Sequence, residues 1–204
     1  MAATRLSRER RSGFKEVKPA ILIVGDGKSE RRYFEQLRDS GTIIKVISRD
    51  TNETGIDNTI AKAHGYVSDY KLDLRRDRVA IVTDLDYRYD LEGVKTMVRK
   101  CDAECYELYL SNPCFEVWLV LHYKKQTKAM DPDQLCDLLT KLSGKEYRKS
   151  MGIQWSIQMQ ETAIDNANRL AGGKPLTAER CLETDPSTMV HILVESIKKH
   201  RPAR

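Results

Sequence analysis

Two short, nearly unbroken apolar runs constrain the fold of this chain more than any other feature of its sequence. Ala20–Val24 ends at Gly25, and Arg78–Thr83 ends at Asp84. Neither run alternates apolar with polar residues, as a strand with one solvated face would. Short β-branched runs that end at glycine or aspartate are typical of strands buried on both faces of a parallel sheet. The sequence therefore predicts a parallel sheet at the core.

Helical and extended patterns alternate around these two runs. Apolar spacing, glycine stops and capping residues predict helices over residues 28–37, 57–74 and 91–100 and strands over residues 42–47 and 104–110. Asp57 is expected to cap the second of these helices, and Asn112 and Pro113 to cap and open a buried helix after the last strand. This order predicts an α/β fold with a mostly parallel sheet flanked by helices.

The pattern changes beyond residue 124. Residues 131–142, 160–171 and 187–200 have helical periodicity, and no strong strand pattern separates them. We therefore expect a basic flexible arm (residues 1–18), an α/β core (19–124) and a helical C-terminal portion packed on that core (125–204).

The composition favours a cytoplasmic protein without a membrane partner. No stretch approaches the roughly 20 consecutive apolar residues of a membrane span, and the polar, basic N-terminus lacks the apolar segment of a secretory signal. The five cysteines are dispersed and form no CxxC pair, so we expect reduced packing residues rather than disulfides or a zinc site.

The charge distribution is compatible with a nucleic-acid partner. The net charge is +5, and basic residues crowd the first eighteen positions, among them Arg8, Arg10 and Arg11. Two interpretations of this arm remain open. It is either a solvated segment or one that follows phosphates and adds salt-sensitive affinity.

Three acidic residues follow predicted strands, at the sheet edge where ligands bind in parallel α/β folds. Asp26 follows the first strand, and Asp84 and Asp86 end the third, two positions apart. Alternation along an extended chain would put the last two carboxylates on one side. Such a pair repels unless a cation lies between its members, and Mg²⁺ or Mn²⁺ is the natural candidate. The alternative is a turn in which these aspartates cap the next helix.

The segment of residues 114–122 is apolar on nearly every side, which predicts a buried helix. Glu116 lies near its start, and a buried carboxylate has to be paired or bound to a cation. A metal site and an ion pair with a basic residue of the helical portion both remain open. His122 lies one turn after Trp118, where a packed core histidine is the ordinary interpretation. Glu30 alone is a favourable charge in a first helical turn.

Two further motifs are less specific. The glycines beside Asp26 match neither the Walker A nor the Rossmann spacing, so nothing indicates nucleotide hydrolysis. The cluster Lys145–Lys149 is either a solvated face or a set of phosphate contacts that stabilise developing negative charge.

Taken together, three motifs resemble the RloB family in sequence and in order. They are ILIVGDGKSERRYF from residue 21, VAIVTDLD from residue 79, and SNPCFEVW from residue 111 with the following Leu121-His122. The segment from Pro186 to Leu193 also resembles a C-terminal feature of the family, so the resemblance spans most of the chain. The family usually has glutamate where this chain has Asp26, which is one methylene shorter, and threonine at the position of Ser29.

RloB proteins are similar to Toprim-fold enzymes, in which a glutamate after the first strand and a D-x-D after the third form a metal site. The resemblance therefore implies a Toprim-like core in which Asp84 and Asp86, with Asp26, hold Mg²⁺ or Mn²⁺. It implies catalytic or site-lining roles for Asp26, Glu30, Glu116, His122 and Lys149. We expect nucleic-acid contacts from Lys28 and Arg88 in addition to Arg8, Arg10 and Arg11.

The family is tied to restriction–modification loci and abortive phage defence, often beside a partner ATPase. The resemblance thus implies a Mg²⁺-dependent nuclease that cleaves DNA or RNA, tRNA included. One alternative is a catalytically weak, nucleic-acid-binding effector subunit that a partner ATPase activates. A second is a phospho-acceptor receiver domain, which also carries acids after its first and third strands.

Overall fold

The computed structural model of the chain describes residues 19–25, 27–37, 43–48 and 55–199. Both Asp26 and the basic arm with Arg8, Arg10 and Arg11 lie outside the described residues. The described elements follow one another as β1 (Ala20–Gly25), α1 (Lys28–Glu35), β2 (Ile43–Ser48), α2 (Ile56–Asp69), β3 (Arg78–Asp84), α3 (Leu91–Ala103), β4 (Glu107–Asn112), α4 (Glu116–Leu121), α5 (Pro132–Ser143), α6 (Ile157–Leu170), α7 (Ala178–Glu183), β5 (Ser187–Thr188) and α8 (Val190–Lys199).

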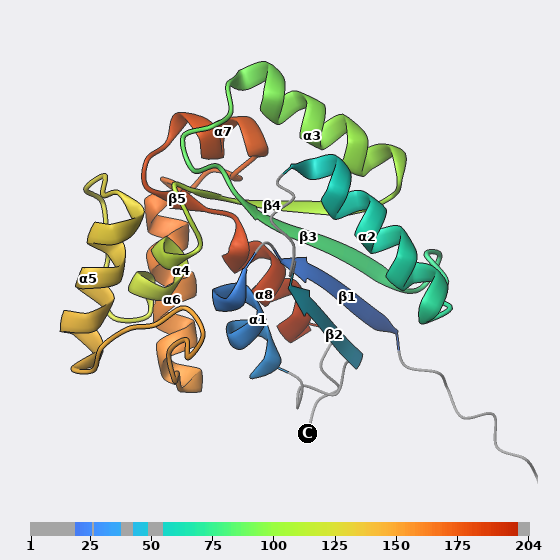
Figure 1. Ribbon diagram of the computed structural model, residues 1–204. Helices are drawn as coiled ribbons and strands as arrows, with labels where there is room; N and C mark the ends of the chain where they lie inside the picture. The colour runs from blue at the N-terminus through green and yellow to red at the C-terminus, as the bar shows by residue number, and fades with distance from the viewer. Residues whose placement is uncertain (1–18, 26, 38–42, 49–54, 200–204) are drawn as a thin grey trace, which may run out of the picture.

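Within these residues, the strands form one sheet in the order β2-β1-β3-β4-β5. The pairs β1–β2, β1–β3 and β3–β4 are parallel, and the short β5 is antiparallel to β4. The prediction of an α/β fold with a mostly parallel sheet flanked by helices is confirmed (Figure 1). Gly25 pairs with Val82, and Asp84 pairs with Ser111, so the carboxyl ends of β1, β3 and β4 meet at one edge.

The central strands are buried because helices cover both faces of the sheet. Side chains alternate between the two faces along a strand. Leu22 and Ile81 belong to a core formed with α2 and α3, whereas Ile23 and Val82 belong to the larger core formed with α1, α4, α6 and α8. Figure 1 shows α2 and α3 on one side of the sheet and α1 and α8 on the other. Burial on both faces explains why the apolar runs of the sequence are unbroken.

Two boundary predictions were wrong. Gly55, not Asp57, occupies the N-cap position of α2, and Asp57 lies in the first turn, where its carboxylate accepts a hydrogen bond from Lys100 Nζ at 2.5 Å. The fourth strand begins at Glu107 rather than at residue 104, because the chain first turns through Cys105, which has a φ of 57°.

Asn112 ends β4, and the prediction that it caps a helix was wrong. Its side-chain amide donates to three backbone carbonyl oxygens in and just after α7, at 3.1 to 3.2 Å. Pro113 follows through a cis peptide bond, and α4 begins only at Glu116. Asn112 therefore ties the end of the sheet to the C-terminal part of the chain.

The C-terminal part contains a strand that the sequence did not predict. Its first helix, α5, begins as expected, with Asp131 and Gln134 forming a capping box. The helix α7 was not predicted, and the residues expected to open the last helix form β5 instead. Ser111 Oγ and Thr188 Oγ1 lie 2.9 Å apart, so a side-chain hydrogen bond reinforces the β4–β5 pairing. This edge strand makes the C-terminal part a component of the core sheet.

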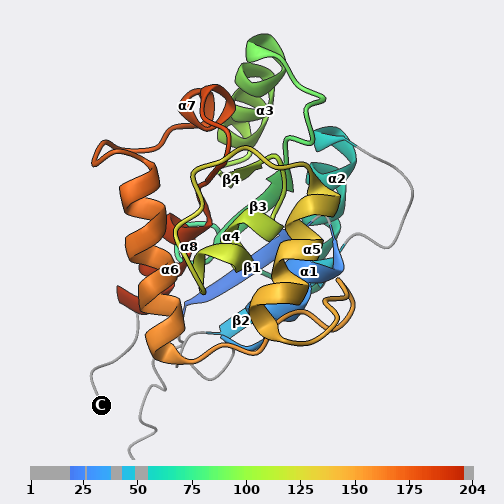
Figure 2. The same ribbon diagram turned by 90° about the vertical axis from the view of Figure 1, so that its left-hand side faces the viewer.

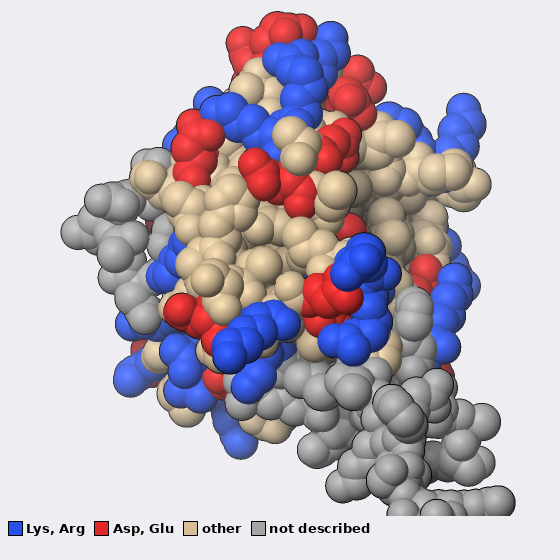
Figure 3. Space-filling view, turned by 90° about the vertical axis from the view of Figure 1, so that its right-hand side faces the viewer, with Lys and Arg blue, Asp and Glu red and all other residues tan. Residues whose placement is uncertain are grey.

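The face at the amino end of β1 carries charges of both signs. Figure 3 shows basic and acidic side chains interspersed around a largely uncharged area, in the part of this face that the described residues form. That area offers no extended positive surface to a polyanion. Among the described helices, none combines the length and apolar character that a membrane crossing requires.

Candidate active site

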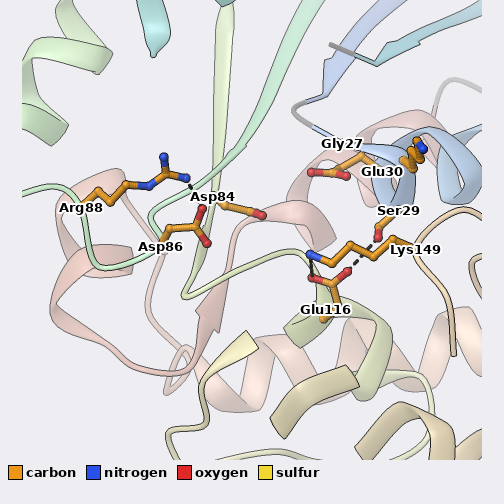
Figure 4. Close-up of a pocket in the computed structure, with 9 residues that line it drawn as sticks. Gly27, Ser29, Glu30, Asp84, Asp86, Arg88, Glu116 and Lys149 are labelled. Atoms are coloured by element: carbon orange, nitrogen blue, oxygen red, sulfur yellow. Dashed lines mark hydrogen bonds and ion pairs between the residues drawn. The ribbon is translucent and has the colours of Figure 1, made fainter. Parts of the chain in front are cut away.

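A pocket of about 180 Å³ lies at the carboxyl ends of the central strands. Its lining comes from the start of α1 (Gly27, Lys28, Ser29, Glu30), the end of β3 and the following turn (Asp84, Asp86, Arg88), the start of α4 (Glu116) and the loop after α5 (Lys149) (Figure 4). Figure 2 views the molecule from the side on which α1, α4 and α5 lie in front of the strands. Apart from Gly27 and Ser29, every lining residue was predicted as a site residue from the sequence.

Glu30 packs against the glycines that follow the apolar part of β1. It lies in the first turn of α1 and is buried. A Cβ atom at Gly27 would lie 3.0 Å from Glu30 Oε2, and one at Gly25 would lie 2.8 Å from Glu30 Cβ. Any larger residue at these two positions would therefore push against the Glu30 side chain. The glycines leave the space in which its carboxylate lines the pocket.

The two aspartates of the D-x-D motif reach the pocket in different ways. Asp84 is the last residue of β3. Asp86 lies in the following turn, where it has a φ of 46° and its N–H donates to the Pro113 carbonyl oxygen at 2.9 Å. Strand alternation therefore stops at Asp84, and the turn brings the second carboxylate to the pocket. Asp86 also pairs with Arg88 in this turn.

Neither Asp84 nor Asp86 caps the next helix, α3, so the helix-cap alternative is wrong. The N-cap of α3 is Asp90, whose side chain accepts a hydrogen bond from the Gly93 N–H at 2.8 Å. Asp84 and Asp86 line the pocket instead.

Glu116 is the most buried carboxylate of the pocket, with 1% of its surface exposed. Ser29 Oγ donates to Glu116 Oε1 at 2.7 Å, and the Tyr147 hydroxyl donates to the same oxygen at 3.0 Å. Lys149 Nζ lies 3.5 Å from the other oxygen, Oε2 (Figure 4). The ion pair with a basic residue of the C-terminal part, one of the two alternatives, is therefore present.

These contacts keep both partners of the ion pair charged. Burial alone would raise the pKa of Glu116, but the Lys149 charge and hydrogen bonds from neighbouring side chains, Ser29 first, outweigh it and lower the pKa. Burial alone would lower the pKa of Lys149, but the Glu116 carboxylate and other nearby groups raise it. At neutral pH, Lys149 is therefore a cation and is unsuited to act as a base.

His122 does not line the pocket, although it was predicted as a catalytic residue. It is 2% exposed and packs against the rings of Tyr33, Trp118 and Trp155. Its Nδ1 lies 3.0 Å from the Trp118 carbonyl oxygen, and burial lowers its pKa to about 4. The structure therefore places a neutral, packed histidine behind the site.

Besides Gly27, sequence reasoning missed two side chains of the site, Ser29 and Tyr147. Ser29 lies beside the predicted Glu30 in the GDGKSE motif, from which Asp26, Lys28 and Glu30 were predicted as site residues but the serine was not. Tyr147 sits among charged residues at positions 145–149, yet it is only 9% exposed, so the solvated-face interpretation is wrong for it. An aromatic residue inside a charged cluster was the available signal.

The oxygen donors of the pocket fit a hard divalent cation. Asp84 and Asp86 present carboxylates, the ligand type that Mg²⁺ and Mn²⁺ prefer. Within the described part of the chain, no group of three histidine, cysteine, aspartate or glutamate side chains lies close enough to form a metal site. Mg²⁺ is commonly bound by one or two carboxylates and completes its coordination with water and phosphate, so this pair is compatible with it. The predicted third ligand, Asp26, is not among the described residues.

Comparison with protein families identifies the chain. The profile of the RloB-like protein family matches residues 21–197 and so spans β1 to α8. Comparisons with curated proteins and with solved structures gave no match. The matched region contains every residue that lines the pocket. The chain is therefore a member of the RloB-like protein family.

Proposed function

We propose that this protein is a Mg²⁺-dependent nuclease that cleaves phosphodiester bonds of DNA or RNA in the cytoplasm, as part of anti-phage defence. One observation carries the proposal. A single pocket at the carboxyl ends of a parallel sheet combines four carboxylates with three basic side chains: Glu30, Asp84, Asp86 and Glu116 with Lys28, Arg88 and Lys149. Acidic groups that bind a cation, next to basic groups that bind phosphate, are the combination that metal-dependent phosphodiester hydrolysis uses.

Each group of side chains has a distinct role in this proposal. Asp84 and Asp86 would hold the metal ion, which when bound supplies charge stabilisation at the phosphate and a more acidic water. Lys149, with a raised pKa, binds and orients a phosphate oxygen as a permanent cation. Glu116, ionised and buried, provides an oxygen that can accept a proton inside the pocket.

The basic residues also support the choice of a polyanionic substrate. Lys28 is exposed at the start of α1, where the helix N-terminus favours negative ligands, and Arg88 is partly exposed on the other side of the pocket. Together with Lys149 they surround the carboxylates with positive charge. Nucleic-acid binding through these residues is expected to weaken as the salt concentration rises.

Calorimetry of Mg²⁺ and Mn²⁺ binding, followed by a cleavage screen on DNA and RNA, tests the proposal. The wild type is compared with the double variant Asp84→Ala/Asp86→Ala. We expect the metal to bind the wild type only and cleavage to disappear in the variant. Cleavage that persists in a folded double variant would refute the proposed site.

One observation favours a second function, that of an effector subunit activated by a partner ATPase. In the described structure, Asp86 is paired with Arg88 and Glu116 with Lys149, so basic side chains of the pocket itself neutralise these two carboxylates. A partner or substrate that draws these basic side chains away would activate a resting site. Cleavage that appears only when an ATPase from the same locus is added would support this function, and turnover by the isolated protein would count against it.

A further inference from the structure

We propose that Ser29 and Tyr147 are positioning residues for Glu116. Their hydroxyl groups hold one carboxylate oxygen, Oε1, and thereby present the other, Oε2, to Lys149 and the pocket. The catalytic consequence of this inference rests on the proposed nuclease function. Its structural content does not, because the orientation and ionisation of Glu116 can be measured without a substrate.

The contacts form a closed triangle of oxygen atoms. Ser29 Oγ and Tyr147 Oη lie 2.7 Å and 3.0 Å from Glu116 Oε1, and 2.9 Å from each other. All three side chains are at most 9% exposed. Hydrogen bonds between side chains are worth more where water is excluded, so this triangle is suited to fix the carboxylate.

A count of protons shows why the carboxylate is the centre of this triangle. The two hydroxyl groups have two protons for three contacts, so two contacts at a time are hydrogen bonds. The ionised Glu116 only accepts. Either both hydroxyls donate to it, or one hydroxyl donates to the other and the second donates to Glu116. In every arrangement, at least one proton points at Oε1.

The same geometry leaves Oε2 of Glu116 facing Lys149 and the pocket. Both hydroxyls are on the Oε1 side, and Lys149 Nζ lies 3.5 Å from Oε2. Lys149 is 54% exposed, so its ammonium group can turn towards a phosphate in the pocket. Oε2 would then lose its counter-charge while Oε1 stays hydrogen-bonded. A carboxylate held in this way faces the bound phosphate with one oxygen of defined position.

The residues of this network come from three distant parts of the chain. Ser29 lies in the first turn of α1, Glu116 opens α4, and Tyr147 and Lys149 lie together in the loop after α5. The backbone N–H of Tyr147 donates to Thr140 Oγ1 at 2.9 Å, which anchors this loop to α5. One anchored loop therefore delivers both the hydroxyl that acts on Oε1 and the cation that acts on Oε2.

Among the described residues, other titratable groups also lie near Glu116. They include Cys114 just before α4, Cys136 on α5, Asp84, whose charge acts on Cys114 and Lys149, and the pocket-lining Glu30 and Asp86. Burial raises the pKa of both cysteines, so they stay neutral at physiological pH. Besides burial, the titration of Glu116 therefore reports on Lys149 and on the hydrogen bonds from Ser29, the Cys114 thiol and Tyr147.

Carboxyl-carbon NMR of protein labelled with ¹³C-glutamate, with Glu116→Gln to assign the signal, tests the inference. Ser29→Ala and Tyr147→Phe should each raise the pKa of Glu116 by roughly one pH unit, the shift expected for a lost hydrogen bond to a charged group. The double variant should raise it further, because Oε1 then has no hydroxyl donor left. An unchanged Glu116 pKa in both single variants would overturn the inference.

Two controls separate positioning from general packing. Ser29→Thr keeps the hydroxyl and should leave the Glu116 pKa close to that of the wild type. Tyr106→Phe removes the hydroxyl of an equally buried tyrosine in the core on the α2 side of the sheet and should leave it unchanged. A pKa that rises equally in Tyr106→Phe would mean that the effect reflects packing.

Cleavage kinetics distinguish this inference from the proposed function. Tyr147→Phe should lower kcat about tenfold or more with little change in KM, because its hydroxyl acts through Glu116, whereas Lys149→Met should mainly raise KM. Ser29→Thr, which keeps a hydroxyl, should have a kcat closer to that of the wild type than Ser29→Ala has. If the protein cleaves no nucleic acid, the nuclease proposal fails and the NMR titration still decides the inference. If cleavage occurs and Tyr147→Phe matches the wild type in kcat and in Glu116 pKa, the inference alone fails.

Discussion

The two walls of the pocket differ in how far they bury their carboxylates. The wall formed by α1, α4 and the loop after α5 buries its carboxylate, Glu116, and surrounds it with fixed donors. The wall formed by the β3 turn leaves Asp86 partly exposed, with 30% of its side chain accessible and an exposed surface partner, Arg88. One wall is therefore organised before any ligand arrives, whereas the other keeps accessible oxygen atoms for one.

This difference indicates that the two walls have different roles in the site. A buried carboxylate with fixed donors has a defined position and protonation state, which suits an oxygen that handles protons. An accessible aspartate in a turn, such as Asp86, can be reached by a hydrated cation and its phosphate ligand, which suits metal binding. Substitutions in the two walls should therefore differ in their effects on cleavage and on stability.

The largest effect is expected from the β3 wall. Asp84→Asn/Asp86→Asn removes both charges and keeps the side-chain size, so we expect cleavage to fall by about 10² to 10³ or more. The exposed Asp86–Arg88 pair contributes little to stability, so the thermal unfolding temperature should change only slightly. Rate measurements and thermal unfolding check both points. Glu92→Gln, on an exposed side chain of α3, is the matched control and should cleave normally.

The next effect concerns the glycines beneath Glu30. Gly27→Ala places a Cβ atom 3.0 Å from Glu30 Oε2, so the carboxylate has to move, and we expect cleavage to fall about tenfold. Gly65→Ala is the control, because no atom lies within 4 Å of its new Cβ. It should stabilise α2 by about 0.5 to 1 kcal/mol and leave cleavage unchanged. A Gly27→Ala variant with normal activity would show that the position of Glu30 is not critical.

A smaller effect is expected in the acid stability of the buried wall. The pKa of Glu116 in the folded protein lies below its ordinary value of 4.5. A lowered carboxyl pKa stabilises the folded state at higher pH, and this contribution is lost as the pH falls below about 4.5. Urea unfolding at pH 3 to 7 should therefore show that Glu116→Gln is less stable than the wild type near neutrality, with a gap that closes in acid. A gap independent of pH would contradict the ionised state.

The smallest effect on activity is expected for His122→Phe. Burial lowers the pKa of His122 from 6.5 to about 4, so the unfolded chain binds a proton in this range and the folded protein does not. Wild-type stability should fall by about 3 kcal/mol as the pH drops from 6.5 to 4. His122→Phe should remove this dependence and keep cleavage within about twofold of the wild type. A large loss of cleavage in a folded variant would show that His122 takes part in catalysis.

Local patterns were sufficient to predict the four parallel strands of the sheet and the acidic residues at its edge, and the family resemblance added further residues of the pocket. The strand ends at Gly25 and Asp84 follow from unbroken apolar runs, and parallel pairing then brings Glu30, Asp84 and Asp86 to one edge. Glu116 was identified because a carboxylate in an apolar helix needs a partner. The position of each of these residues depends on its immediate neighbours in the chain, and this is why the sequence alone could indicate it.

The missed features depend on contacts between distant segments. β5 has only two residues, too few for a periodic pattern, and it exists because it pairs with the end of β4. Asn112 followed by Pro113 has the local signature of a helix start. The Asn112 amide instead donates hydrogen bonds to backbone carbonyl oxygens in and just after α7. The family motif did not reveal which side of α4 faces the pocket, and His122 lies on the other side, among aromatic rings.

The long separation between partners also sets the order in which this site can form. Ser29 meets Tyr147 across 118 positions of the chain, and β4 acquires its outer neighbour only when Thr188 is available. Contacts between such distant segments form after local ones, because a large loop has to close first. A chain still on the ribosome would thus contain β1 to β4 without a completed pocket. The proposed active site would therefore be completed only after Tyr147 and Lys149 have been synthesised and have reached Ser29 and Glu116.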